Sequence, residues 1–240
     1  MKTLKTGFFL LIALLSIASL HAQTADEIIT KYITAIGGKD KINAVKSVYV
    51  ESTLEVMGNE APTTTTIVNG KAFKSETDFN GQKIISVITD KGGWMLNPLM
   101  GQTAPEALPA DQAKAGQSQL QVGGPLFDYA AKGNKVELVG KEDVNGVSAH
   151  KIKVTTKDSV ESTYFIDPTT YYILKAVSKG GGQDGETTIT FSNYQKTEFG
   201  YVIAMGQQIT TPQGITLNIT NKKVEVNKEI DPKVFEMPKS

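Results

Sequence analysis

The chain has 240 residues, with 25 basic and 25 acidic side chains and no cysteine. Every basic residue is a lysine, whereas base-edge readout and bidentate phosphate recognition depend heavily on arginine. We therefore expect no nucleic-acid partner, and the lack of cysteine excludes a disulfide, a thiolate nucleophile and a lipid-attachment cysteine.

Residues 1–23 have the pattern of a secretory signal peptide. Lys2 and Lys5 precede the apolar run Phe8–Leu20, which ends in small and polar residues. The run is shorter than the roughly 20 residues that a membrane-spanning helix needs, so an uncleaved anchor is the weaker alternative. We predict cleavage near Ala22 or Gln23, a periplasmic protein, and one domain over residues 24–240.

The mature chain is predicted to begin with an amphipathic helix. Thr24 and Glu27 have the spacing of a capping box, in which the side chain of each residue accepts a hydrogen bond from the backbone N–H of the other. An apolar stripe at helical spacing follows, and Gly37-Gly38 provides a stop. The stripe consists of Ile28, Ile29, Tyr32, Ile33 and Ile36. A second short helix is expected over Lys39–Val45.

From Ser47 the apolar period changes to two, which indicates β-strands. Asn69-Gly70, Asn80-Gly81 and Asn145-Gly146 are strong two-residue hairpin signals. Successive hairpins predict an antiparallel meander. Strands are expected near 47–56, 63–68, 71–78, 83–89, 94–98, 186–194, 201–211 and 215–226, with more between residues 135 and 178.

The stretch Val160–Ser178 predicts the clearest hairpin. Strand-forming runs flank Asp167-Pro168-Thr169-Thr170, a typical turn sequence. Tyr164 and Ile166 point to one face of the predicted strand and Phe165 to the other. Large apolar groups on both faces indicate that both faces of this part of the sheet are covered.

Residues 99–133 interrupt the meander. This run lacks period-two alternation and contains Pro105, Pro109 and Pro125. A helix is expected from about Pro109 to Leu120, and another helical turn at Leu126–Ala131. A structureless run of this length is uncommon in a compact domain, so we interpret it as a functional insertion or lid.

Together these elements predict a mainly β fold. About 11–12 antiparallel strands exceed what a strongly twisted sheet accommodates while flat, so the sheet should curl. We expect a half-open, incomplete β-barrel wrapped around the N-terminal helix and the helical lid insertion.

Catalysis is poorly supported by the sequence. His150, the one histidine of the mature chain, lies in an alternating strand with no acid or nucleophile placed beside it by any motif. The aspartates sit at turns and helix starts, where Asp is favoured for backbone reasons. We predict that the protein is not an enzyme and has no catalytic residue, metal site or cofactor.

Apolar residues on both sides of the insertion are candidates for a ligand cavity. Flexible Met and aromatic side chains beside a lid could line such a site, although ordinary core packing is the alternative for each one. The ten candidates are Trp94, Met95, Leu96, Leu99, Met100, Leu120, Leu126, Phe127, Tyr164 and Ile166.

Several motifs in this order resemble one family. They are "GGWMLNP", "YFIDPTTYYILKA", "TTITFSNYQ" and "VEVNKEIDPKVFEMP", of which Phe165–Pro168 and Asn227–Phe235 are the most telling. With the signal peptide, capped helix and meander, they resemble the periplasmic lipoprotein carriers of the LolA/LolB/LppX superfamily over essentially the whole mature chain.

The resemblance implies a hydrophobic cavity that holds the acyl chains of a lipid or lipoprotein non-covalently. The resemblance also implies that the partners are a lipid or lipidated protein and membrane proteins of the envelope. It further implies that the carrier is a monomer. The carriers latch their lid with an arginine, which this chain lacks. The alternative function is a cell-envelope interaction module that uses the same fold without carrying cargo.

Overall fold

The structure is a computed structural model that describes residues 23–179 and 185–238. The predicted signal peptide, apart from Gln23, lies outside the described residues. The helices are α1 (Ala25–Ala35), α2 (Lys39–Ala44) and α3 (Ala110–Ala115), with 3₁₀ turns η1 (Pro98–Met100), η2 (Gly116–Leu120) and η3 (Pro232–Phe235). None of the helices in these ranges is long and apolar enough to cross a membrane.

Thirteen described strands form one antiparallel sheet in the order β6-β5-β4-β3-β2-β1-β13-β12-β11-β10-β9-β8-β7. They are β1 (Ser47–Val56), β2 (Asn59–Val68), β3 (Ala72–Phe79), β4 (Gln82–Thr89), β5 (Gly92–Leu96), β6 (Glu106–Ala107), β7 (Lys135–Val144), β8 (Val147–Thr155), β9 (Glu161–Ile166), β10 (Ile173–Lys179), β11 (Glu186–Lys196), β12 (Val202–Thr210) and β13 (Thr216–Val226).

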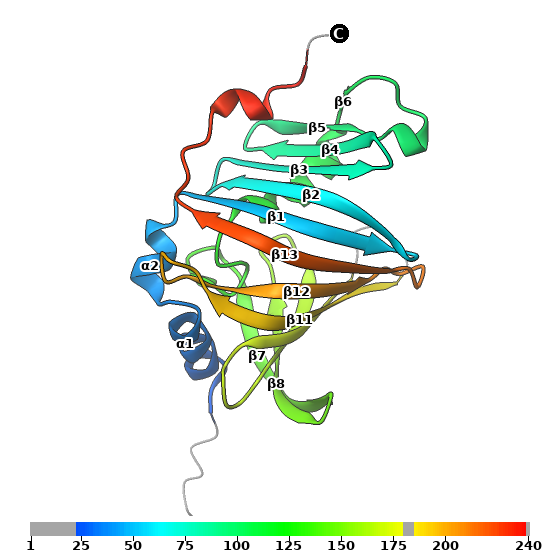
Figure 1. Ribbon diagram of the computed structural model, residues 1–240. Helices are drawn as coiled ribbons and strands as arrows, with labels where there is room; N and C mark the ends of the chain where they lie inside the picture. Colours follow the sequence, from blue (N-terminus) through cyan, green and yellow to red (C-terminus); the bar gives the residue numbers. More distant parts are fainter. Residues whose placement is uncertain (1–22, 180–184, 239–240) are drawn as a thin grey trace, which may run out of the picture.

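The first strand pairs with the last, β1 with β13, in the middle of the sheet, and β6 and β7 form its two edges. The sheet is strongly curved and open, and α1 and α2 lie at one end of its concave side (Figure 1). The predicted half-open barrel around an N-terminal helix and an insertion is confirmed. The unpredicted two-residue strand β6 takes the count to thirteen.

Local turn chemistry explains much of the meander. Asn80 and Gly81 both have positive φ angles, 54° and 81°, as do Asn145 and Gly146, 53° and 84°. This is the backbone of a type I′ hairpin turn, which the Asn-Gly pairs predict. Asn69-Gly70 does not form the predicted two-residue turn, because only Gly70 of the pair has a positive φ (72°) and the loop between the paired residues Val68 and Ala72 has three residues. Asn69 instead has a second role. Its amide donates to Val45 O (3.0 Å) and its Oδ1 accepts the N–H of Val122 (3.1 Å), so it joins the end of α2 to the insertion.

The β9–β10 hairpin has a longer loop than predicted, because Tyr171 and Tyr172 belong to the loop and not to the strand. Asp167 Oδ1 accepts the N–H groups of Thr169 (2.6 Å) and Thr170 (3.0 Å), which fixes the turn. The prediction that both faces are covered is confirmed. Ile166 lies in the main core, and Phe165 lies in a separate cluster on the other face.

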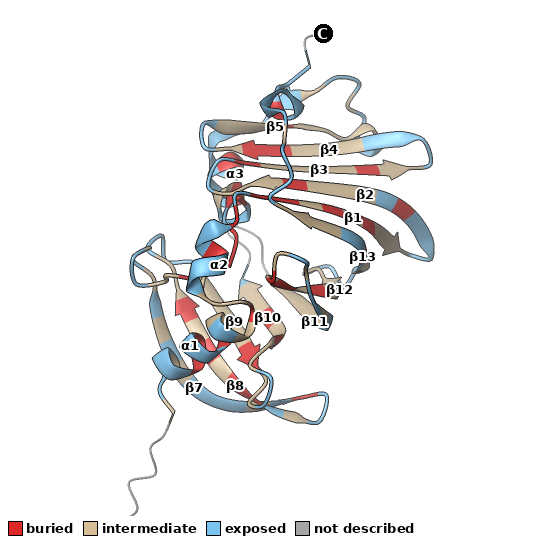
Figure 2. Ribbon diagram, turned by 60° about the vertical axis from the view of Figure 1, so that its left-hand side comes forward, coloured by how far each residue is buried: buried red, intermediate tan, exposed pale blue. Residues whose placement is uncertain are grey.

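The main core lies between α1 and the concave face of the sheet. The capping box is present, because Thr24 Oγ1 accepts the N–H of Glu27 and the Glu27 carboxylate accepts the N–H of Thr24. Figure 2 shows buried positions on the strands behind α1. The predicted stripe supplies four buried core residues, and α2 adds one, Ile42. Each fully buried side chain of this size contributes about 1.5–3 kcal/mol relative to an exposed one.

The insertion is only partly helical. The predicted helix is divided into α3 and η2, and residues 122–133, hereafter the 122–133 segment, form hydrogen-bonded turns. Lys132 N–H donates to Asp128 O (3.1 Å) at the predicted helical turn. Gly123 has a φ of 87°, and a Cβ there would lie 2.8 Å from Cβ of Phe127. Glycine is therefore required where the segment folds back on itself.

Candidate functional site: an apolar cavity beneath the first helix

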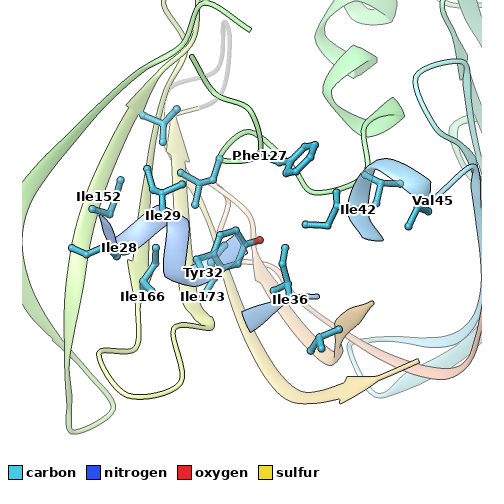
Figure 3. Close-up of a cluster of buried hydrophobic side chains, with 14 of the residues drawn as sticks. Ile28, Ile29, Tyr32, Ile36, Ile42, Val45, Phe127, Ile152, Ile166 and Ile173 are labelled. Carbon is cyan, nitrogen blue, oxygen red and sulfur yellow. The ribbon is translucent and has the colours of Figure 1, made fainter. Parts of the chain in front are cut away.

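An apolar cavity of about 290 Å³ lies between α1, the 122–133 segment and strands β9–β12. Helix α1 supplies Tyr32 and Ile36, and the segment supplies Leu126. Figure 3 shows the labelled α1 side chains beside Ile166 and Ile173, with Phe127 on the segment across from them. The sheet side of the cavity is formed by Tyr164, Ile173, Ala176, Ile189, Phe191, Tyr194, Tyr201, Val202, Ile203, Ala204 and Gln207.

Four tyrosines line the cavity, and the burial of each one disfavours its charged phenolate form. Burial raises the pKa of Tyr32, Tyr194 and Tyr201, and it raises the pKa of Tyr164 to about 12. Tyr194 OH donates to Ile173 O at 2.7 Å, so its polar end is satisfied. A site that disfavours the phenolate also disfavours any charged group of a ligand. The cavity suits a hydrocarbon chain.

A second apolar groove, of about 500 Å³, lies on the other side of the 122–133 segment against α1. Ile29 and Ile33 form its α1 wall, and Phe127 and Ala130 lie opposite them. Leu126 lines both the groove and the cavity and is 1% exposed. Leu126 is therefore the one side chain that the two linings share.

Polar contacts hold the 122–133 segment to the helices. Asp128 pairs with Lys39 of α2 (Oδ1–Nζ 2.8 Å), and Tyr129 OH donates to the Asp26 carboxylate of α1. That hydrogen bond raises the pKa of Tyr129. Because the Lys39–Asp128 pair is largely exposed, its contribution is about 0–1 kcal/mol. The segment is fastened weakly on this side.

Four of the ten predicted site residues meet at this core. Tyr164 and Leu126 line the cavity, Phe127 lines the groove, and Ile166 is fully buried in the adjoining core. Leu120 is buried at the end of η2, where its carbonyl accepts the N–H of Gly70 (2.7 Å), outside the cavity lining.

The other five candidates lie elsewhere. Trp94 and Leu96 belong to a separate cluster with Phe235 and Ile230 of the C-terminal tail, and Trp94 Nε1 donates to Phe235 O at 2.9 Å. Met95 alternates with Trp94 and lies half-buried on the other face of the sheet. Leu99 and Met100, in η1, are 55% and 76% exposed. The ten candidates therefore do not form one cavity.

Trp94 is the only tryptophan of the chain, so its emission should report the C-terminal tail. We expect Phe235→Ala to shift this emission to longer wavelength and to lower the free energy of unfolding by about 3 kcal/mol, since it uncovers a buried ring. Fluorescence and urea denaturation measure both effects. An emission maximum that stays fixed in Phe235→Ala but moves when an acyl ligand is added would place Trp94 near the ligand instead.

Sequence reasoning missed the contribution of β11 and β12 to the lining. Simple alternation would not place Phe191 and Tyr194 on one face, because they are three residues apart. Asn193, between them, has a φ of 52°, and this left-handed residue lets both side chains reach the cavity. The only sequence signal is an Asn inside a strand pattern.

His150 is buried in β8, 3% exposed, and burial lowers its pKa from the ordinary 6.5, with help from Lys141 and Lys31. Among the described residues, no group of three or more His, Cys, Asp or Glu side chains could hold a metal ion. His150 is thus a buried residue whose protonated form is disfavoured by burial and by the charges of Lys141 in β7 and Lys31 in α1.

We expect the protein to lose stability as the pH falls below about 6.5. The folded state favours neutral His150, so the unfolded state binds more protons between the lowered pKa and 6.5. Stability from this group is complete above pH 6.5 and declines below it. The melting temperature between pH 7.5 and 5 should fall less steeply in His150→Gln. Equal slopes for the two proteins would contradict the assignment of this pH dependence to His150. The carboxylates with lowered pKa values, such as Glu76, affect stability only below this pH range.

No protein-family model and no curated protein sequence matches the chain. Solved structures do share its fold. An outer membrane lipoprotein-sorting protein domain from Vibrio parahaemolyticus is 14% identical with a TM-score of 0.57, covering 87% of this chain and 94% of that one. A LolA superfamily protein from Nitrosomonas europaea is 11% identical with a TM-score of 0.57, covering 90% and 98%.

A DUF1329 family protein from Desulfovibrio piger is also similar, at 11% identity and a TM-score of 0.54, with coverage of 88% and 96%. In all three cases the alignment spans nearly the full length of both chains. Sequence identities this low show a shared fold and do not indicate a shared cargo. This chain has the fold of the LolA superfamily.

Proposed function

We propose that the protein is a periplasmic binding or carrier protein that holds an acyl chain of a lipid or lipidated protein non-covalently. The observation that carries this proposal is the tyrosine-lined apolar cavity beneath α1, which shares Leu126 in its lining with a second apolar groove. The shared fold with a lipoprotein-sorting domain supports it. Binding of this kind needs no cofactor and no catalytic group.

The energy of such binding comes from removing methylene groups from water, at about 0.8 kcal/mol each. A 14-carbon chain would thus gain roughly 10 kcal/mol if it were fully buried. The cavity, at about 290 Å³, is at the lower limit of the ~300–1,000 Å³ typical of ligand sites. A long chain therefore fits only if Leu126 moves and the groove joins the cavity.

The 122–133 segment is the part of the predicted lid that controls this movement. The carriers that this chain resembles latch their lid with an arginine. In this protein Lys39 fastens the 122–133 segment to α2, and Tyr129 fastens it to α1. We expect the double variant Lys39→Gln/Tyr129→Phe to release a bound acyl probe several-fold faster, while the free energy of unfolding falls by less than about 1 kcal/mol. Stopped-flow displacement measures the release. Lys91→Gln/Tyr49→Phe, which alters residues far from the segment, is the control, and equal release rates in the two double variants would rule out the latch.

The function is tested on protein purified from the periplasm of its own host. Native mass spectrometry followed by lipid extraction should detect a bound lipid or lipopeptide. Protein that arrives empty and also has no affinity for fluorescent acyl probes would refute the proposal.

A second candidate is an interaction module of the cell envelope. The strands β12 and β13 diverge at one end (Figure 1). A cleft of about 590 Å³ lined by residues of both strands favours this candidate. Their recorded pairing covers Gly206–Thr210 of β12, and at its end Asn221 Nδ2 donates to Ala204 O (2.9 Å) in place of a ladder bond. Exposed strand edges can accept an added strand. A photo-crosslinker at Met205, in the cleft, should then capture an envelope protein that the same crosslinker at exposed Met57 does not.

A further inference from the structure

A polar pocket of about 550 Å³ adjoins the apolar cavity, and the two share Gly124 and Pro125 in their linings. Its other walls come from α3 and η2, the β8–β9 loop and the end of the 122–133 segment. The charged groups of the lining are three lysines, Lys114, Lys132 and Lys157, and one aspartate, Asp158. The pocket therefore carries an excess of positive charge.

Lys132 lies where the polar pocket meets the apolar cavity. It is half-buried, and its Nζ donates to Gly124 O at 2.9 Å, so two of its three N–H donors remain for another acceptor. The ring centroid of Phe127 lies 5.8 Å from the same ammonium. Burial lowers the pKa of Lys132, and the nearby Asp128 partly opposes that effect. A cation that is short of water at such a position gains from an anionic partner.

The remaining charges of the pocket leave room for that partner. Lys114 pairs with Asp158 (Nζ–Oδ1 3.2 Å), which accounts for the one aspartate, and both groups are largely exposed. Lys157 is exposed at the rim beside Gly133. Asn134 Nδ2 donates to Pro125 O at 3.3 Å, so the shared wall is held from the polar side.

We propose that this pocket binds the anionic headgroup, a carboxylate or a phosphate, of an amphiphile whose hydrocarbon chain occupies the apolar cavity. The inference rests on the proposed function, since it assigns the chain to that cavity. Charge-assisted hydrogen bonds from lysine to carboxylate or phosphate supply the headgroup contact. The pocket and the cavity meet at Gly124 and Pro125, so the bond between headgroup and chain would cross there.

The test compares ligands that share one chain and differ in charge. Oleate, the neutral monoolein and inorganic phosphate are titrated into the full mature protein by calorimetry, below the micellar concentration of the lipids. We expect oleate to bind roughly tenfold more tightly than monoolein at low salt, as one good charge-assisted contact provides. The difference should shrink at high salt, because the pocket is open to solvent.

Two lysine variants locate the effect. Lys132→Gln and Lys157→Gln should each weaken oleate binding several-fold and leave monoolein binding within about twofold. Lys157→Gln keeps the test valid if Lys132→Gln disturbs the Gly124 contact, which its melting temperature would reveal. The control, Lys91→Gln/Lys233→Gln, removes two exposed lysines outside the pocket and should bind oleate like the wild-type protein.

The outcomes separate this inference from the proposed function. Equal affinity for oleate and monoolein overturns the headgroup pocket and leaves the acyl cavity standing. Binding of neither lipid overturns both. Inorganic phosphate that binds in a Lys132-dependent manner, without any preference for oleate over monoolein, identifies a free-anion site and also overturns the headgroup assignment.

Discussion

Replacing Ile28 by alanine is expected to lower the free energy of unfolding by about 3 kcal/mol. Ile28 is 0% exposed and lies in the first turn of α1, where it packs into the main core with Ile152 and Ile166. Removing three carbon atoms there costs their transfer free energy and leaves a cavity that the rigid sheet cannot collapse to fill. Urea denaturation followed by circular dichroism measures the loss.

Thr30→Ala is the matched control, because Thr30 is an exposed residue on the same helix. It should change the free energy of unfolding by no more than about 0.5 kcal/mol. A loss below about 1 kcal/mol for Ile28→Ala would mean that α1 is not docked as described. The result matters for function, since the same stripe carries Tyr32 and Ile36 into the cavity lining. A helix that is loosened at Ile28 would therefore also loosen the roof of the cavity.

Local features of this fold were predictable because they depend on neighbours in sequence. The Thr24–Glu27 capping box and the Asn80-Gly81 and Asn145-Gly146 turns are short-range chemistry, and the structure contains each of them. The open antiparallel sheet followed from the succession of hairpins. The β1–β13 pairing did not, because it joins strands more than 150 residues apart and neither turn residues nor periodicity specify it.

The candidate site was predicted less well, and Trp94 shows the reason. Strands β4 and β5 carry apolar side chains on both faces, since the tail with Ile230 and Phe235 covers one face and α3 with η2 approaches the other. Alternation separates Trp94 from Met95 but does not say which of them points toward the cavity. The one sequence signal that a tail covers this face was the pair of apolar residues after the last strand, Ile230 and Phe235. Leu126, Phe127, Tyr164 and Ile166 lie together because the insertion and the central hairpin both pack against α1.

The second large effect expected concerns the cavity itself. Ile189→Trp should weaken the binding of a fluorescent acyl probe at least tenfold, because the indole would occupy the space that the chain needs. Ile189 lines the cavity beside the small side chain of Ala176, its partner across β10 and β11, so a larger group can enter without displacing the sheet. Equilibrium titration with the probe measures the affinity, and circular dichroism confirms that the fold persists.

Thr190→Trp provides the matched control. Thr190 is the next residue of β11 and pairs with Lys175, on the face opposite to the cavity, so the same indole is added one position away and outside the site. Probe affinity within about twofold of the wild-type value is expected for it. If Ile189→Trp and Thr190→Trp bound the probe equally, the acyl chain would lie elsewhere. The choice would then shift to the cleft between β12 and β13, because its lining residues Met205 and Lys222 do not line the cavity.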